Sequence, residues 1–125
     1  MSIKWFNEKP KIGVATLTDQ NITLNKAATS YFENAYSVML GISEDESTIV
    51  IKPLDKSEAM RHDIPDNKKY RITVRSSYSR VSNKAFMQEI SEIFNVDLAD
   101  EPRKYPTSWD KKEHILMIQL RGSIK

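Results

Sequence analysis

The sequence predicts a small, β-rich α+β domain in which two similar strand-strand-helix-hairpin units form one barrel-like core. One stretch occurs twice, because residues 22–27 (Ile-Thr-Leu-Asn-Lys-Ala) return in looser form as residues 80–85 (Arg-Val-Ser-Asn-Lys-Ala). The same order of strand and helix patterns surrounds both copies. The length of 125 residues and the hydrophobic content of 39% suit one ordinary domain. We therefore predict a single domain, residues 1–125, with repeat units at 12–54 and 70–121 and a connector at 55–69.

The first unit opens with two short strands and a capped helix. Residues 12–17 and 22–24 are predicted strands, and the Asp- and Asn-containing residues 18–21 between them are typical of a turn. Asn25 is the predicted N-cap of the helix, because its side-chain oxygen can accept from exposed backbone N–H groups of the first turn. The apolar face of this short helix is predicted to consist of Ala27, Ala28, Tyr31 and Phe32.

A hairpin is predicted to complete the first unit. Residues 36–42 and 48–52 read as its strands, with an acidic turn between them and Pro53 ending the second strand. The polar connector that follows, residues 55–69, is predicted to contain one helical turn near Glu58.

The second unit repeats this order with a longer helix. Residues 70–75 and 80–82 are predicted strands, and either Ser82 or Asn83 is predicted to cap the helix. The buried face of this helix is predicted to consist of Phe86, Ile90, Ile93 and Phe94.

Two further strands are predicted to end the second unit. Pro106 within residues 104–109 confines that strand to an edge or a bulge, since proline cannot donate to a ladder. Residues 114–120 are almost continuously apolar, which predicts burial on both faces.

Composition excludes several classes of protein. The chain has no cysteine, which excludes disulfides and thiolate chemistry and fits a cytoplasmic location. No apolar run approaches the roughly 18 residues that a membrane span needs, and we expect no signal peptide. Residues 1–11 are predicted to be a loosely attached arm whose Trp5 and Phe6 pack against the body.

Several stretches of the first unit match a known motif. Residues 22–24 (Ile-Thr-Leu), Lys26 and residues 49–53 (Ile-Val-Ile-Lys-Pro) follow the order of the AbrB/SpoVT swapped-hairpin family, which the unit resembles. That family has Gly-Arg-Ile-Thr-Leu-Pro-Lys before its short helix and Ile-Val-Leu-Lys-Pro at the end of its hairpin. This chain has Gln20-Asn21 in place of the Gly-Arg and Asn25 in place of the proline. The resemblance covers residues 13–54 and, more loosely, residues 70–121.

The resemblance implies both a fold and a function. In that family, copies from two chains interlock into one small barrel that binds DNA, so a tandem copy implies the same barrel within one chain. The family's DNA-contacting arginines lie on the amino-terminal hairpin. Here residues 13–24 contain no Arg or Lys, whereas the second hairpin contains arginines.

The best candidate site lies on this second hairpin. Residues 71, 73 and 75 share one face of their strand, opposite the apolar face of residues 70, 72 and 74. Such a polar face can contact phosphates, and a neighbouring tyrosine can stack on bases. An ordinary solvated strand face is the alternative. The candidate nucleic-acid-binding residues are Arg71, Arg75, Tyr78, Arg80 and Lys84.

The distribution of charge favours the same region. Residues 60–84 have seven Lys or Arg and two Asp, residues 85–101 have five acidic residues and no Lys or Arg, and the whole chain has a formal net charge of +2. Solvated faces of alternating charge would give the same pattern. If the acidic segment, residues 85–101, lies across the arginines, protein interaction is favoured. If it lies elsewhere, nucleic-acid binding is favoured.

No catalytic, metal or cofactor site is predicted. His62 and His114 have no second ligand at metal-binding spacing, and the carboxylate pairs Asp45-Glu46 and Asp100-Glu101 fall in predicted turns and loops. We therefore expect a non-catalytic protein that needs no cofactor. DNA is one expected partner and another protein is the alternative, with no membrane association and either a monomer or a homodimer.

Overall fold

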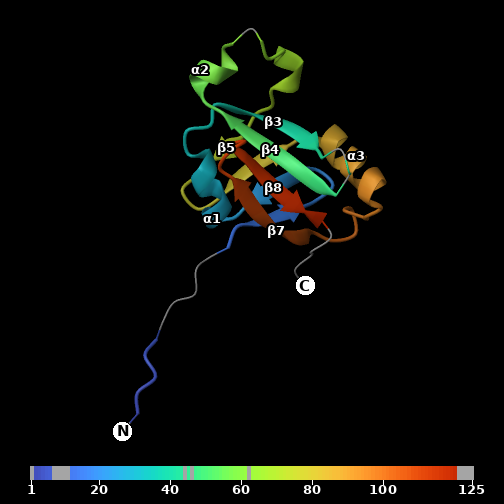
Figure 1. The fold of residues 1–125 in the computed structure, drawn as a ribbon. Helices are drawn as coiled ribbons and strands as arrows, with labels where there is room; N and C mark the ends of the chain where they lie inside the picture. Colours follow the sequence, from blue (N-terminus) through green and yellow to red (C-terminus); the bar gives the residue numbers. More distant parts are fainter. Residues whose placement is uncertain (1, 7–11, 44, 46, 62, 121–125) are drawn as a thin grey trace.

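The computed structural model describes residues 2–6, 12–43, 45, 47–61 and 63–120. Within these ranges the chain is β-rich, with short helices between the strands (Figure 1). The strands are β1 (Val14–Leu17), β2 (Asn21–Leu24), β3 (Ser37–Ile42), β4 (Thr48–Leu54), β5 (Thr73–Val74), β6 (Ser79–Ser82), β7 (Arg103–Asp110) and β8 (Ile115–Gln119). The α-helices are α1 (Lys26–Thr29), α2 (Lys56–Ala59) and α3 (Lys84–Phe94), and the 3-10 helices are η1 (Ser30–Phe32) and η2 (Asp66–Lys68).

The strands form one antiparallel sheet that is curled into a half-barrel. Their order is β3-β4-β8-β7-β1-β2-β6-β5, so each hairpin of one half of the chain neighbours a hairpin of the other half. A single bridge joins the two ends of this order, because Val38 and Tyr70 exchange backbone hydrogen bonds of 2.9 and 2.8 Å. The prediction of a small α+β domain rich in strands is therefore confirmed.

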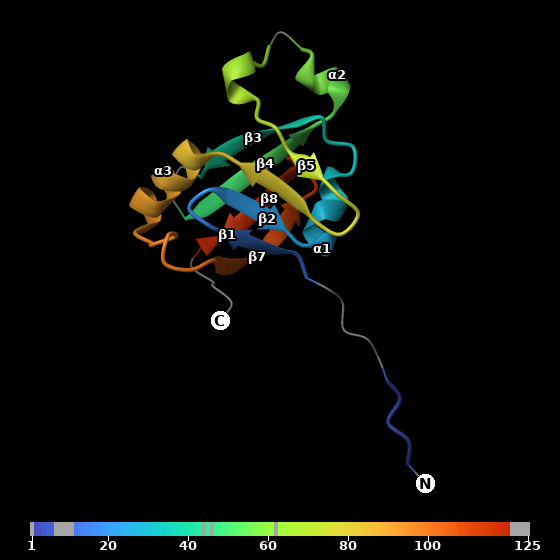
Figure 2. The same ribbon diagram turned by 180° about the vertical axis from the view of Figure 1, so that it is seen from behind.

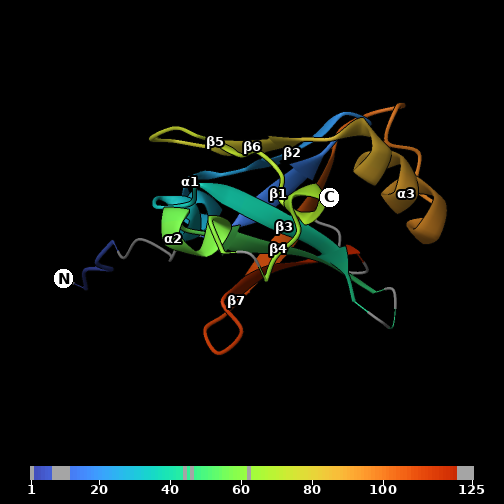
Figure 3. The same ribbon diagram turned by 90° about the horizontal axis from the view of Figure 1, so that it is seen from above.

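The helices lie at the ends of the curled sheet. Figure 3 shows α3 at one end, and α1 and α2 toward the opposite end. Figure 2 shows the connector with α2 standing above the strands and the amino-terminal segment extending away from them. Among the described residues, no helix is long and apolar enough to cross a membrane.

The core fills the concave side of the sheet. Alternating residues of β1 and β2 are fully buried, as the period of a half-buried strand requires. Helices contribute Phe32 from η1 and Met87 and Ile90 from α3. Phe86, Ile93 and Phe94, which were predicted to be buried, are only half-buried, because the helix packs on the sheet through a narrower stripe.

Both predicted asparagine caps are present. Asn25 Oδ1 accepts from Ala28 N at 3.1 Å and also from Val14 N at 3.0 Å, so this cap also holds the beginning of β1. Asn83 Oδ1 accepts from Phe86 N at 2.9 Å, and Ser82 is instead the last residue of β6. Of the two caps considered for the longer helix, Asn83 is the correct one.

The strand end predicted at Pro53 is wrong, and so is the edge position that was one of the two alternatives predicted from Pro106. Pro53 does not end its strand, since β4 continues to Leu54 beyond the stretch that pairs with β8. Pro106 does not place β7 at an edge, because β7 lies between β1 and β8. At Pro106 the strand changes partners, pairing with β1 up to this residue and with β8 from Thr107 onward. The missing N–H of Pro106 therefore costs neither the β7–β1 pairing nor the β7–β8 pairing a hydrogen bond, and a sheet tolerates proline under this condition.

Two other strand predictions need correction. The strand predicted at residues 70–75 is reduced to β5, because Tyr70 bridges to β3 whereas residues 73 and 74 pair with β6. Strand β8 buries one face fully, at Leu116 and Ile118, whereas on the other face Ile115 and Met117 are half-buried and Gln119 is exposed. The prediction that this strand is buried on both faces is therefore wrong.

The amino-terminal segment does not pack on the body. We call Ser2–Phe6 the arm; its Ile3, Trp5 and Phe6 side chains are 57%, 80% and 91% exposed. The prediction that Trp5 and Phe6 pack against the domain is therefore wrong for the single chain.

Candidate nucleic-acid interface

A row of side chains that are not buried crosses five neighbouring strands on the outer face of the sheet. Thr16 of β1 lies opposite Lys104 on one side and Thr23 on the other. Thr23 lies opposite Arg80 of β6, which in turn lies opposite Thr73 of β5. Residues opposite one another project from the same face, so the five side chains form one line of about 19 Å, four strand spacings. Every side chain in this line is either basic or carries a hydroxyl group.

Arg71 and Arg75 lie at the end of this row. Exposure alternates from residue 71 to residue 75, so that both arginines and Thr73 are exposed while Ile72 and Val74 are half-buried. The predicted division of this segment into a polar and an apolar face therefore holds, although only two of its residues form a strand. We call the row together with Arg71 and Arg75 the basic face.

The turn between β5 and β6 brings Tyr78 and Arg80 together. Arg80 Nε donates to Thr23 Oγ1 at 3.3 Å, and its guanidinium carbon lies 5.4 Å from the centre of the Tyr78 ring. That is the geometry of a cation–π contact. Because Nε and the ring together orient the guanidinium, its terminal N–H groups remain available to an anion.

The sequence analysis missed Lys104, which the fold adds to the basic face. Lys104 is 24 positions beyond Arg80, and only the pairing of β7 with β1 places it in the same row. The next residue, Tyr105, is buried on the opposite side of β7, and burial raises the pKa of its phenol against the opposing effect of the Arg103 charge. That phenol therefore stays neutral near pH 7 and adds no negative charge beneath the face.

Lys84 is separate from the basic face. Together with Asp19 and Asp97 it lines a shallow cavity between the β1–β2 turn and the end of α3. Figure 3 places α3 at the end of the sheet opposite the β5–β6 turn, so the acidic segment lies by Lys84 and not across Arg75. Lys26 is exposed at the start of α1, and Lys11 lies outside the described residues.

The cations of the basic face are not neutralised by carboxylates. Across the part of the chain that is described, the ion pair is that of Lys69 with Asp66, at 3.2 Å in the connector. Arg71, Arg75, Arg80 and Lys104 are thus exposed cations with no ion pair to a described residue. Unpaired cations on a surface of hydroxyl groups suit an anionic partner.

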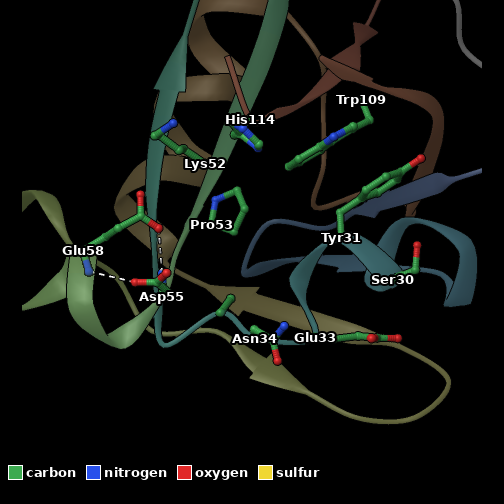
Figure 4. Close-up of a pocket in the computed structure, with 11 residues that line it drawn as sticks. Ser30, Tyr31, Glu33, Asn34, Lys52, Pro53, Asp55, Glu58, Trp109 and His114 are labelled. Atoms are coloured by element: carbon green, nitrogen blue, oxygen red, sulfur yellow. Dashed lines mark hydrogen bonds between the residues drawn. The ribbon is translucent and has the colours of Figure 1, made fainter. Parts of the chain in front are cut away.

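A groove beside η1 is the other candidate site (Figure 4). Its aromatic wall is the stack of Tyr31 on Trp109, whose ring centres are 4.5 Å apart and whose planes differ by 8°. The His114 ring meets Trp109 edge-on at 6.3 Å. Pro53 lies across from this wall, and the groove has a volume of about 380 Å³. We call this feature the aromatic groove.

The polar rim of the aromatic groove is acidic. Glu33, Asp55 and Glu58 contribute three carboxylates against the single ammonium of Lys52, which donates to the Glu113 carbonyl at 2.8 Å. Asp55 and Glu58 also cap α2 reciprocally, through bonds of 2.8 and 3.2 Å that Figure 4 marks. The Asp55 and Glu58 carboxylates are therefore held in place by the fold.

The histidines and carboxylate pairs considered in the sequence lie apart from one another where the structure describes them. No three His, Cys, Asp or Glu side chains of the described ranges gather closely enough to hold a metal ion. His114 lines the aromatic groove, whereas His62 and Glu46 fall outside the described residues. Asp45 accepts from two serine hydroxyls of its own turn, and Asp100 and Glu101 are exposed.

In comparisons with known proteins, no family model, no curated protein and no solved structure matches this chain.

Proposed function

We propose that this chain is a non-catalytic cytoplasmic protein that binds nucleic acid with its basic face. The observation that carries the proposal is the row Lys104–Thr16–Thr23–Arg80–Thr73, which crosses five strands without a carboxylate. Lysine and arginine neutralise phosphates, and threonine hydroxyls donate to phosphate oxygens. The partner proposed is duplex DNA.

The spacing of the charges is compatible with this partner. Lys104 and Arg80 are separated by three strand spacings, about 14 Å. The major groove of B-DNA is about 12 Å wide. A surface with cations at this separation can contact the phosphates on both sides of one groove. Arg71 and Arg75 would extend these contacts along one strand of the duplex.

We also propose that the chain is an internal duplication. The first argument comes from the hairpins that open the two units. The first hairpin closes with a bond from Thr18 N to Asn21 O at 3.0 Å, and the second with a bond from Arg75 N to Tyr78 O at 2.8 Å. Both turns have two central residues, and they are offset by 57 positions, from 18 to 75. Strands β2 and β6 then pair along their whole lengths, and each is followed by an asparagine cap.

The hairpins that close the units also correspond in register. Ile42 pairs with Ile49 in the first, and Trp109 pairs with Leu116 in the second. Both members of the pair are offset by 67 positions, from 42 to 109 and from 49 to 116. The bridge between Val38 and Tyr70 has its counterpart in the pairing of β7 with β1. An arrangement in which each half pairs with the other supports two equivalent units, 12–54 and 70–121, and the resemblance to the AbrB/SpoVT family.

The proposal is tested by the salt dependence of binding to a mixed-sequence duplex. Each phosphate contact should contribute about 0.9 to the slope of log affinity against log salt concentration. Changing Arg71, Arg75 and Arg80 to alanine should therefore reduce the slope by up to about three units. The measurement is fluorescence anisotropy between about 50 and about 200 mM salt, a range over which such contacts weaken strongly.

The matched control removes the same charge elsewhere. Lys56, Lys111 and Lys112 are exposed residues of α2 and the β7–β8 turn, away from the basic face. Their triple alanine variant has the same net charge as the arginine variant, so an unchanged slope in this control would assign the contacts to the basic face. Equal losses in both variants would overturn the proposed site, and an absence of binding at low salt would overturn the function.

A protein-interaction module is the second candidate function. The aromatic groove favours it, because its volume of about 380 Å³ and its stack of an exposed Tyr31 on a half-buried Trp109 suit a partner's side chains. If this alternative holds, changing Tyr31 would abolish binding of the partner protein, whereas the triple arginine variant would still bind it.

A further inference from the structure

The apolar side chains of the arm are largely exposed in the single chain. Trp5 and Phe6 are 80% and 91% exposed, and Ile3 is 57% exposed. Contiguous apolar side chains at a surface mark an interaction site, because leaving them in water is unfavourable. The arm is therefore a candidate for packing against an apolar surface.

The aromatic groove has the chemistry of such a surface. Its Tyr31–Trp109 wall offers rings against which Trp5 and Phe6 can pack. Its rim carries Glu33, Asp55 and Glu58, whereas the arm carries Lys4 between its apolar residues and no acid. The two surfaces are thus complementary in both polarity and charge.

The chain leaves the body at Ile12 and Gly13, close to the aromatic wall of the groove. Ile12 O accepts from Asn25 Nδ2 at 3.0 Å, and Gly13 O accepts from Thr107 N at 3.0 Å, so the chain is fixed where the arm's linker ends. Gly13 also lines a cavity that it shares with Tyr31 and Trp109. From Ile12 back to Phe6 there are six residue steps, which reach at most about 20 Å. This length suffices to cross to the groove of a second molecule whose corresponding side faces the first.

We propose that the arm of one chain occupies the aromatic groove of a second copy, and that the exchange is reciprocal in a two-fold symmetric dimer. Buried aromatic side chains each cover about 150–250 Å², so Trp5 and Phe6 of the two arms together contribute about 600–1,000 Å² of arm surface to a reciprocal contact. A two-fold operation repeats each contact, as isologous dimers do.

Sedimentation equilibrium of the full chain tests the proposal. The unmodified protein should show a monomer–dimer equilibrium. Changing Trp5 and Phe6 to serine should weaken it at least about a hundred-fold, because both buried rings are lost. Changing Tyr31 to serine should weaken it about ten-fold through loss of the stacked wall. The control is Tyr36→Ser, which removes an exposed ring that lies outside both the arm and the groove lining and should leave the equilibrium unchanged.

Isotope-filtered NMR on a mixture of labelled and unlabelled chains identifies which groove is occupied. Contacts between Trp5 of one chain and Trp109 of the other are expected. A monomer at all concentrations, or contacts between these residues only within one chain, would overturn the proposal. A dimer that persists after both the arm and the Tyr31 changes would overturn it as well.

Discussion

The hairpins β1–β2 and β5–β6 lie side by side and have turns of the same length, yet they differ in what they bury. The first places Leu17, Ile22 and Leu24 in the core with no exposed surface. The second buries Val81 and the polar Ser79, and its first strand pairs over only two residues. The first hairpin is therefore the better-anchored of the two.

The two hairpins differ just as clearly in charge. Residues 13–24 contain no Lys or Arg, whereas the second hairpin exposes Arg71, Arg75 and Arg80. The neighbouring threonines of the first hairpin nevertheless lie in the same row as Arg80. The difference shows that two neighbouring hairpins with turns of the same length can have different roles, the first stabilising the sheet and the second exposing cations.

The largest effect on stability should come from shortening a buried side chain of each hairpin. Leu24→Ala should lower the free energy of unfolding by about 2–5 kcal/mol, because it leaves a cavity in a fully buried site. Val81→Ala removes fewer buried carbons and should cost less. Denaturant unfolding monitored by circular dichroism measures both. Equal costs would contradict the stronger anchoring of the first hairpin.

The next largest difference should be between the stability costs of removing the two asparagine caps. Asn25 makes three hydrogen bonds, to Ala28 N, Val14 N and Ile12 O, whereas Asn83 makes one bond to its helix. Asn25→Ala should cost about 2 kcal/mol, and Asn83→Ala about 0.5–1 kcal/mol. A larger cost at Asn83, measured from the denaturation midpoints, would mean that the longer helix depends more on its cap than on packing.

A buried pair of hydroxyl groups joins α1, which follows the first hairpin, to β6 of the second hairpin. Removing either hydroxyl should destabilise the fold by a different amount. Thr29 Oγ1 lies 2.8 Å from Ser79 Oγ and also donates to Leu24 O at 3.2 Å. Thr29→Val should cost about 1–2 kcal/mol, since it leaves the Ser79 hydroxyl buried without its partner. Ser79→Ala should cost less, because Thr29 keeps its bond to Leu24. A double-mutant cycle in which the two changes add fully would show that the pair is not coupled.

The smallest effect concerns the ring that orients Arg80. Tyr78→Leu removes the cation–π contact at 5.4 Å and should cost no more than about 1 kcal/mol of stability. On the proposed function it should also weaken DNA binding slightly without changing the salt slope, because no cation is removed. A slope that falls as far as in the arginine variant would contradict this account of Tyr78.

The caps and turns could be predicted from sequence because they are local. An asparagine before an apolar helical pattern meets its N–H partner three residues later, whatever the rest of the chain does, as Asn25 and Asn83 illustrate. Alternation likewise assigned Arg71 and Arg75 to a polar face, since the period of two is a property of the strand itself.

Only the tertiary structure decided which faces lie next to one another. Strand periodicity states that a side chain points outward but not which strand lies beside it, so neither Lys104 beside Thr16 nor Arg80 beside Thr23 was predictable. The same holds for the stack of Tyr31 on Trp109 and for the change of partner that makes Pro106 acceptable inside the sheet. These features depend on pairing between distant strands, which is selected by burial of the whole core rather than by any short stretch of the chain.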